Sequence, residues 1–424
     1  MEHKLNDISR RSFFQTSGAA GAAAFTIIKP ELVRGAGKDR LKAGLVGCGG
    51  RGTQAVIDLM QGTENIDVVS MGDLFEDKLE GSLTKIRGHK DFPTFESRLK
   101  VDPEHHFTGF DAYKKVLASD IDIVMLATPP GYRPMHFEAA VEAKKHVFCE
   151  KPFGTDPVGV RRFMAAAKKS EQLKLTVMSG AQRRNDANYV QTVRKIQDGT
   201  IGEVLALYAY WVGRPVIQQK ARDPKWGDMT WEHRNWYSFV WICGDQIVEQ
   251  HLHNIDVCNW VMGTHPVEVV ATGGAVWRPR EELYGNIYDH ISADFVYPGG
   301  VRMSSYCRQF PAPLQQNVSE QIVGTVRRSN GHDLGANVKT VPYVAEHTAM
   351  AASIRGDGPY VNHGMTVAES TMTCIMGRES AYTGDKVTWD QIMASQLDLM
   401  PKEFGYDQKM DVPPLPVPGV YKLV

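Results

Sequence analysis

Three glycines after a short apolar run carry the first chemical signal of the sequence. Residues 41–46 are mostly apolar and lead into Gly47-x-Gly49-x-x-Gly52, and a helical pattern begins at Thr53. A strand that turns tightly through glycines into a helix lets the backbone approach a pyrophosphate, and the helix N-terminus offers it free N–H groups. The pattern therefore predicts a dinucleotide site. Its expected contacts are Gly47, Gly49, Gly50, Arg51 and Gly52.

An acidic residue follows at the distance that such a site requires. The next apolar run, residues 66–71, leads to Asp73, about 20 residues after the glycines. A carboxylate at this point binds a ribose hydroxyl and repels a 2′-phosphate, so the sequence favours NAD over NADP. The alternative is a glycine turn in an unrelated α/β protein, with Asp73 in solvent.

Further apolar runs alternate with helical patterns up to about residue 180. The apolar runs are 121–127, 145–149 and 173–179, and the helical patterns are 110–117, 134–143 and 157–169. This alternation with short links favours a doubly wound parallel sheet. Since Pro129 cannot continue a central strand, the chain leaves the sheet at Thr128, at the edge where a dinucleotide lies. We therefore expect cofactor contacts from both residues.

The second half of the chain has a different pattern. Apolar and polar residues alternate with a period of two at 202–211, 266–271, 290–297 and 301–306. This period predicts a large, mostly antiparallel open sheet with one covered face. With 424 residues, two domains are expected, and both are α/β. The predicted parts are an export signal and linker at 1–37, a Rossmann domain at 38–182, an α/β substrate domain at 183–400 and an extended arm at 401–424.

Composition excludes several functional classes. The formal net charge is −1 at pH 7, and no basic face indicates nucleic-acid binding. The six cysteines are scattered without CxxC spacing, so neither a zinc site nor a dense disulfide framework is expected. We expect mostly free thiols and no metal.

The N-terminus has the features of an export signal. Arg10 and Arg11 precede a small-residue apolar stretch at 18–28. Paired arginines before a weakly apolar segment are typical of a twin-arginine signal, and the segment is short for a transmembrane helix. We expect the twin-arginine export machinery as a partner and a periplasmic or otherwise exported protein, membrane-tethered if the signal is not cleaved. The alternative is a disordered arm with a chance arginine pair.

Three motifs together resemble the Gfo/Idh/MocA oxidoreductases. They are the glycine loop, Glu150-Lys151-Pro152 at the end of a predicted strand, and Glu249-Gln-His-Leu-His253-Asn-Ile-Asp256. The resemblance implies a Rossmann domain followed by a domain whose open sheet often forms an oligomer interface, so we expect a homo-oligomer. It also implies a sugar or cyclitol substrate above the nicotinamide. Glu150 and Lys151 then belong to the cofactor site.

Within this resemblance, Lys151 matches the active-site lysine and His253 the proposed acid/base. Oxidation of a secondary alcohol needs a base beside the hydroxyl, which His253 supplies, and a cation that stabilises the oxygen, which Lys151 supplies. Asp256 is expected on the same helix face as His253 and Glu249. Glu249 departs from the family because many members carry Asp there. His251 lies two positions from His253, which disfavours a shared metal.

Four further residues are candidates for substrate contacts. Aromatic faces pack against sugar rings, and the aromatic residues nearest His253 in the sequence are Trp236, Tyr237 and Trp241. Arg184, with its neighbour Arg183, follows the last predicted strand of the first domain and can line the same cleft. The alternatives are core or interface positions for the aromatic residues and a surface salt bridge for the arginines.

These features predict an exported NAD-containing oxidoreductase acting on a carbohydrate. Because free cofactor is scarce outside the cytoplasm, we expect tightly bound NAD that a second carbonyl substrate reoxidises, as in the glucose–fructose oxidoreductases of this family. The first alternative is a redox-neutral NAD-dependent glycosidase. The second is a non-catalytic dinucleotide-binding module.

Overall fold

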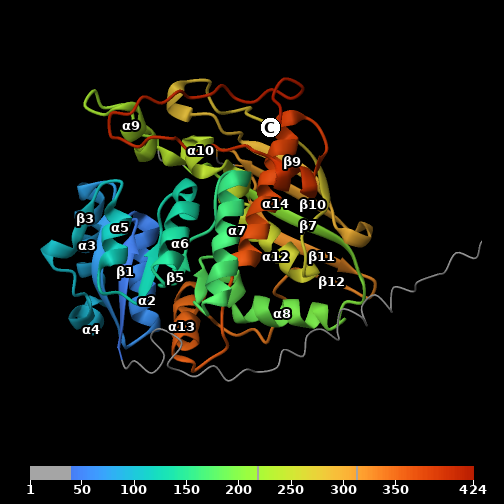
Figure 1. The fold of residues 1–424 in the computed structure, drawn as a ribbon. Coiled ribbons are helices and arrows are strands. Elements are labelled where there is room, and N and C mark those ends of the chain that lie inside the picture. The colour runs from blue at the N-terminus through green and yellow to red at the C-terminus, as the bar shows by residue number, and fades with distance from the viewer. Residues whose placement is uncertain (1–39, 217–218, 312–313) are drawn as a thin grey trace, which may run out of the picture.

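Two sheets of different kinds organise the chain, side by side (Figure 1). The computed structural model describes residues 40–216, 219–311 and 314–424. The predicted export signal therefore lies outside the described residues. Within them, no helix combines the length and the apolar character that crossing a membrane requires.

The first sheet is parallel throughout and has six strands in the order β3-β2-β1-β4-β5-β6. The strands are β1 (Leu41–Val46), β2 (Ile66–Asp73), β3 (His106–Thr108), β4 (Ile123–Leu126), β5 (His146–Cys149) and β6 (Val177–Ser179). Its main helices are α2 (Gly50–Gly62), α3 (Glu76–Arg87), α5 (Ala112–Ala118), α6 (Arg133–Glu142) and α7 (Pro157–Gln172). The predicted doubly wound parallel sheet is confirmed. Its strand order reverses between β1 and β4, and ligands of such sheets bind outside the carboxyl ends of these strands.

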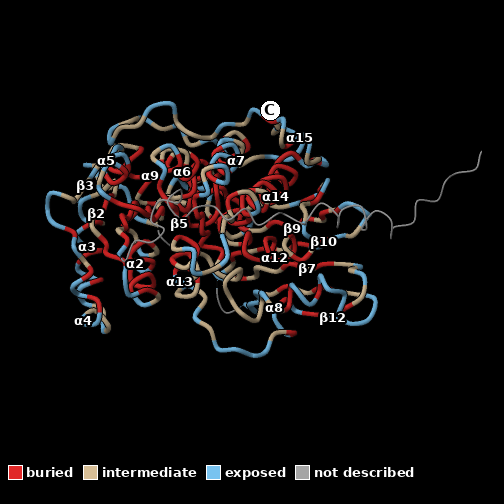
Figure 2. Tube along the Cα trace, turned by 60° about the horizontal axis from the view of Figure 1, so that its bottom comes forward, coloured by how far each residue is buried: buried red, intermediate tan, exposed pale blue. Residues whose placement is uncertain are grey.

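The second sheet has seven strands in the order β12-β11-β7-β10-β9-β8-β13. The strands are β7 (Val204–Gly213), β8 (Glu268–Gly274), β9 (His290–Val296), β10 (Arg302–Gln309), β11 (Asn317–Gly324), β12 (Arg328–Ser329) and β13 (Val387–Thr388). Only β7 and β10 pair in parallel. Helices α12 (Leu252–Met262) and α14 (Gly364–Thr383) lie between this sheet and the first domain (Figure 1). The predicted mostly antiparallel sheet with one covered face is confirmed, and Figure 2 shows the buried residues concentrated between the two sheets.

One helix returns from the second half of the chain to the first domain. Helix α13 (Pro342–Arg355) packs against α2, and its Met350 and Ile354 belong to the apolar core of β1 and β2. Beyond it, the carbonyl of Val361 accepts a hydrogen bond from the N–H of Val177 in β6 at 3.1 Å. The Rossmann core is therefore completed by residues far beyond residue 182.

An insertion and the C-terminal arm lie over the carboxyl edge of the Rossmann sheet (Figure 1). The insertion contains α9 (Asp228–Arg234), a 3-10 turn at Trp236–Ser238 and α10 (Val240–Cys243). The arm, residues 396–424, is fully described and contains no helix or strand. The N–H of Met229 in α9 donates to the carbonyl of Gln408 in the arm at 3.2 Å. The two segments thus form one cover above the sheet edge.

Candidate functional site

A cavity of about 730 Å³ lies between the two domains, at the carboxyl ends of the Rossmann strands. Thirteen of the residues expected in the site line it: Gly47, Gly49, Gly50, Arg51, Asp73, Thr128, Pro129, Glu150, Lys151, Trp236, Tyr237, Glu249 and His253. The structure therefore brings the candidate cofactor residues and the candidate catalytic residues to one cavity.

The glycine loop has the geometry that a diphosphate needs. Gly47 has φ +98°, and a Cβ there would lie 2.6 Å from the backbone of Ala127. At Gly49 and Gly50, by contrast, an added Cβ would meet nothing within 4 Å, so the loop presents open backbone to the cavity. No side chain caps α2, and no acidic residue lies in its first turn. The unshielded positive end of this 13-residue helix fits a negatively charged phosphate group.

Asp73 lies at the cavity wall, and its carboxylate already accepts hydrogen bonds from two backbone N–H groups. Its Oδ2 accepts a hydrogen bond from the N–H of Cys48 in the glycine loop at 2.6 Å, and its Oδ1 accepts one from the N–H of Phe75 at 2.9 Å. Burial raises the pKa of Asp73, and these two hydrogen bonds oppose that shift. The carboxylate therefore braces the glycine loop, and each oxygen keeps a lone pair for a ribose hydroxyl.

Arg51 is held by three carboxylates. Its Nε lies 2.5 Å from Glu150 Oε1, its Nη1 lies 2.8 Å from Asp58 Oδ2, and its Nη2 lies 3.1 Å from Glu346 Oε1. The ring of Tyr343 lies 4.6 Å from the guanidinium carbon. Burial and the Glu150 charge raise the pKa of Glu346 well above its ordinary value. Arg51 is thus fixed in the cavity wall, and α13 supplies two of its partners.

Lys151 is oriented from both domains. Its backbone N–H donates to Glu150 Oε2 at 3.2 Å. The Glu150 carboxylate packs against Gly180, where an added Cβ would lie only 2.4 Å from it. The Lys151 Nζ donates to the backbone carbonyl of Glu249 at 2.5 Å and to Glu249 Oε1 at 3.1 Å. Because an ammonium has three N–H groups, one is left for a ligand in the cavity.

His253 is buried near the start of α12. Its ring stacks against Trp211, with centroids 5.9 Å apart. Burial, followed by the charges of Lys151 and Arg183, lowers the pKa of His253 well below its ordinary value. The imidazole is therefore neutral at pH 7. Among the described residues its Nδ1 has no hydrogen-bond partner, so it is chemically able to exchange a proton with a ligand.

The helix that carries these residues is broken, which differs from the expected continuous helix. Helix α11 (Gln246–Glu249) ends before α12 begins at Leu252. At the break, the N–H of His251 donates to the carbonyl of Gln246 at 3.2 Å, one residue further back than in an α-helix. His251 Nε2 lies 2.8 Å from Ser305 Oγ on the second sheet. His251 is thus engaged with the sheet, apart from the cavity.

Four expected site residues do not line the cavity. Arg184 and Asp256 form a two-pronged ion pair at 2.8 and 2.7 Å, and Ser370 Oγ donates to Asp256 Oδ1 at 2.7 Å. A buried carboxylate needs such partners, and these three hydrogen bonds occupy most of its acceptor sites. Trp241 lies in a cluster of buried aromatic residues and donates its Nε1–H to Glu232 Oε2 at 2.5 Å. Gly52 also lies behind the loop, where a Cβ would lie 1.9 Å from the carbonyl oxygen of Gly47.

Arg183 was expected in this cleft together with Arg184, whereas the other remaining cavity residues have no clear signal in the sequence. Arg183 lines the cavity and forms an ion pair with the fully buried Glu320. Its neighbour Arg184 instead forms an ion pair with Asp256. The cavity is also lined by Tyr132, His136, Gln182, Trp211, His233, Arg234 and Gln250. Only Arg183 had a local signal, since the 182–185 turn follows the last Rossmann strand.

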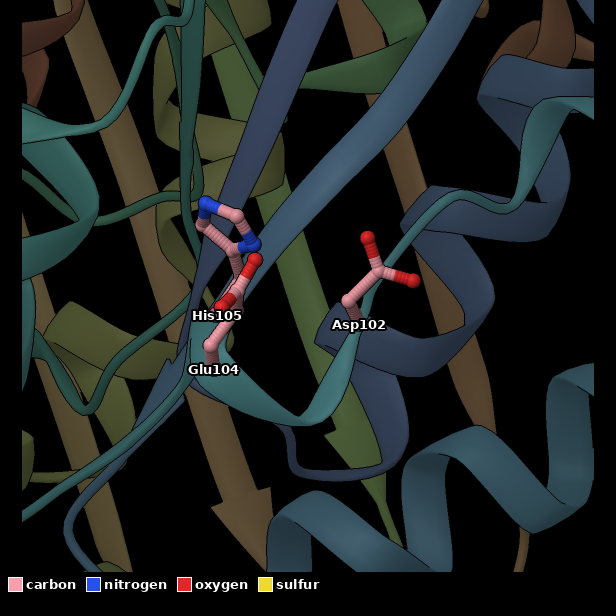
Figure 3. Close-up of side chains that lie close together, drawn as sticks. All are labelled: Asp102, Glu104 and His105. Carbon is pink, nitrogen blue, oxygen red and sulfur yellow. The ribbon is translucent and has the colours of Figure 1, made fainter.

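A separate group of possible metal ligands lies outside the cavity. Asp102, Glu104 and His105 come together just before β3 (Figure 3). Asp102 and Glu104 are exposed, and exposed acidic groups of this kind are common without a metal. In the part of the chain that the structure describes, the cavity itself contains no comparable ligand group.

Comparisons with known proteins agree with this architecture. Residues 41–179 match the Gfo/Idh/MocA profile, an oxidoreductase family with an NAD-binding Rossmann fold. The chain is 29% identical to the inositol 2-dehydrogenase of Rhizobium meliloti over 179 residues, which are 42% of this chain and 47% of that enzyme. It is 26% identical to the uncharacterized oxidoreductase YrbE of Bacillus subtilis over 254 residues, 58% of this chain and 68% of the relative. In each inositol dehydrogenase compared, the matched segment covers between 43% and 57% of that enzyme's length.

Solved structures share the fold over most of the described chain. The scyllo-inositol dehydrogenase of Lactobacillus casei, solved with NAD(H) and scyllo-inositol, has a TM-score of 0.62 at 19% identity and covers 82% of this chain and 99% of its own. An aldose–aldose oxidoreductase of Caulobacter crescentus has a TM-score of 0.58 at 15% identity, covering 82% of this chain and 99% of its own. At these identities, the likeness establishes the two-domain fold alone.

Proposed function

We propose that this protein moves a hydride between a secondary alcohol of a sugar or cyclitol and NAD; the match of residues 41–179 to the NAD-binding Rossmann domain of the Gfo/Idh/MocA oxidoreductases supports this. The observation that carries the proposal is the meeting of Lys151, Glu249 and His253 in the cavity that the glycine loop also lines. The inositol dehydrogenases among the relatives support a polyhydroxylated ring as the substrate.

In this proposal, Lys151 and His253 act on the reacting hydroxyl. His253, neutral because of burial and neighbouring cations, accepts the hydroxyl proton. Two N–H groups of the Lys151 ammonium donate to Glu249, and the third donates to the same substrate oxygen and stabilises its developing negative charge. The nicotinamide, when bound, accepts the hydride. In the reverse direction, His253 returns the proton to the substrate oxygen.

Glu249 has a positioning role in this proposal. Its backbone carbonyl and its Oε1 hold the Lys151 ammonium, while Gln250 donates to its Oε2. Trp236 and Tyr237 contribute aromatic surface to the cavity wall. Such surface suits the C–H face of a sugar ring, so these residues orient the ring while Lys151 and His253 act on one hydroxyl.

We further propose that the protein is exported with NAD already bound. The support is the arginine pair at Arg10 and Arg11 followed by a small-residue apolar segment. A folded exported enzyme keeps working only if its cofactor stays bound and is regenerated in place. A second carbonyl substrate that accepts the hydride would complete such a cycle.

Two measurements on the purified full chain test the function. The first denatures the protein, prepared without added nucleotide, and quantifies the nicotinamide cofactor released per chain. The second incubates the protein with inositols, aldoses and glycosides, and follows both the absorbance of reduced nicotinamide and the release of free sugar. Near-stoichiometric NAD and reduction by a polyol support the proposal. Bound NAD with no net reduction, together with free sugar released from glycosides, favours the redox-neutral glycosidase instead. A chain that binds no NAD contradicts both.

A further inference from the structure

The cavity reaches beyond the Rossmann domain at its adenosine end. Asp73, the expected ribose ligand, marks this end, and the cavity walls beside it are Leu74, Phe75 and Phe110. Directly against these residues, His233 and Arg234 of the α9 insertion continue the wall. In a plain Rossmann domain this side is the open crevice of the sheet. Here it has a protein cover.

Helix α9 is fastened to the Rossmann domain beside Asp73. Arg234 Nη1 and Nη2 donate to the two oxygens of Asp77, in the first turn of α3, at 3.0 and 2.9 Å. The guanidinium carbon also lies 4.0 Å from the centre of the Phe75 ring. The Arg234 side chain is 13% exposed and the Asp77 side chain is 58% exposed, so the guanidinium is covered while its carboxylate partner faces solvent. The bidentate ion pair with Asp77 and the stacked Phe75 ring together fix both the position and the orientation of the Arg234 guanidinium.

The C-terminal arm makes a second attachment at the same place. Tyr406 donates its hydroxyl hydrogen to the backbone carbonyl of Leu74 at 2.8 Å, and its ring lies 5.3 Å from the ring of Phe110. The arm is in turn locked to α9, because Thr230 Oγ1 donates to the carbonyl of Tyr406 at 2.7 Å. A Cβ at Gly227 would lie 2.5 Å from the carbonyl oxygen of Tyr406, so the two segments pack in direct contact.

From these contacts we infer that Arg234 and Tyr406, attached to Asp77 and Leu74, form an adenosine latch that completes the cofactor site and retards cofactor release. The inference rests on the proposed NAD-dependent function and assigns the retention to particular residues. NAD leaves through the adenosine end only after the Arg234–Asp77 pair or the Tyr406–Leu74 hydrogen bond opens. Since the α9 insertion and the arm are locked together, each attachment supports the other.

The test measures the rate at which bound NAD exchanges with labelled NAD in the full-length protein. We expect Arg234→Gln and Tyr406→Ala to accelerate release by about tenfold each. Asp77→Asn should resemble Arg234→Gln, and the double variant Asp77→Asn/Arg234→Gln should release NAD no faster than either single variant, because both changes break one pair. Arg234→Lys, which keeps the charge but loses the two-pronged geometry, should give an intermediate rate.

Arg162→Gln is the matched control. Arg162 is half exposed, pairs with Glu138 on the outer helices of the Rossmann domain and does not line the cavity. It should leave the NAD release rate unchanged. Equal release from wild type, Arg234→Gln and Tyr406→Ala, in protein that still binds NAD and oxidises its substrate, would overturn the latch alone. A wild-type chain that binds no NAD would overturn the proposed function and the latch with it.

Discussion

Lys151 and Glu249 join the two domains at one atom: Nζ of Lys151 donates to both the carbonyl oxygen and the carboxylate of Glu249. Lys151 follows the fifth strand of the Rossmann sheet, whereas Glu249 ends a short helix of the second domain. The ammonium therefore has a fixed position only when the two domains keep this relative orientation. In the proposed reaction this same group would bind the substrate oxygen, so one contact would serve both domain alignment and the proposed chemistry.

Lys151→Ala and His253→Ala should each lower turnover by at least about a hundredfold, because each removes a group that we propose acts on the reacting hydroxyl. Steady-state rates with the best polyol substrate provide the measurement, and circular dichroism checks the fold. Lys169→Ala, which removes an exposed lysine paired with Glu142, is the control and should retain full activity. Near-normal rates in both site variants would contradict the assigned roles.

Arg183→Gln should shift the pH dependence of kcat/KM. The pKa of His253 is lowered by burial first and then by Lys151 and Arg183, so the base loses its function only at pH values well below 6.5. Removing the Arg183 charge raises the pKa of His253 and therefore moves the acid limb of the profile to higher pH. Arg302→Gln, an exposed change on the second sheet, should leave the limb in place. An unchanged limb in Arg183→Gln would show that His253 is not the titrating base.

Asp256→Asn should act on stability more than on chemistry. The Asp256 side chain is 2% exposed and pairs with Arg184, which is 10% exposed, so the substitution leaves a buried cation without its partner. We expect a loss of about 3 kcal/mol in the free energy of unfolding, measured by urea titration. Asp294→Asn breaks an exposed pair with Arg302 and should cost less than about 1 kcal/mol. A full-stability Asp256→Asn protein with abolished turnover would instead restore a catalytic role for Asp256.

Asp73→Asn should weaken NAD binding, because an amide replaces the carboxylate that is expected to bind the ribose and that accepts the N–H of Cys48 in the glycine loop. Titration calorimetry with NAD and NADP checks this. Discrimination between the two cofactors should also narrow, since the negative charge that repels a 2′-phosphate is gone. Unchanged affinities for NAD and NADP would show that Asp73 only holds the glycine loop in place through its hydrogen bond with Cys48.

Much of the fold could be predicted because its signals are local. The glycine loop, the apolar runs of the parallel sheet and the period-two alternation of the second sheet each occupy a few neighbouring residues. Lys151 and His253 were identified through motifs of the same short range. Their presence in one cavity agrees with that expectation, although their chemical roles stay predictions until the variants are measured.

What escaped prediction depends on contacts between distant segments. Arg183 and Arg184 are adjacent and chemically identical, and only the fold decides that one lines the cavity while the other pairs with Asp256. A break between Glu249 and His253 leaves the spacing of the motif unchanged, so no residue pattern reveals it. The cover formed by α9 and Tyr406 likewise requires the two segments to meet above the sheet.

The return of α13 to the Rossmann domain affects how the chain can be made. Because Met350 and Ile354 complete the core around β1 and β2, the first domain cannot finish folding while only its own residues have left the ribosome. A fragment ending near residue 182 would expose that apolar surface and tend to aggregate. Assembly of the first domain must therefore wait until the chain has been made at least through α13, which ends at Arg355.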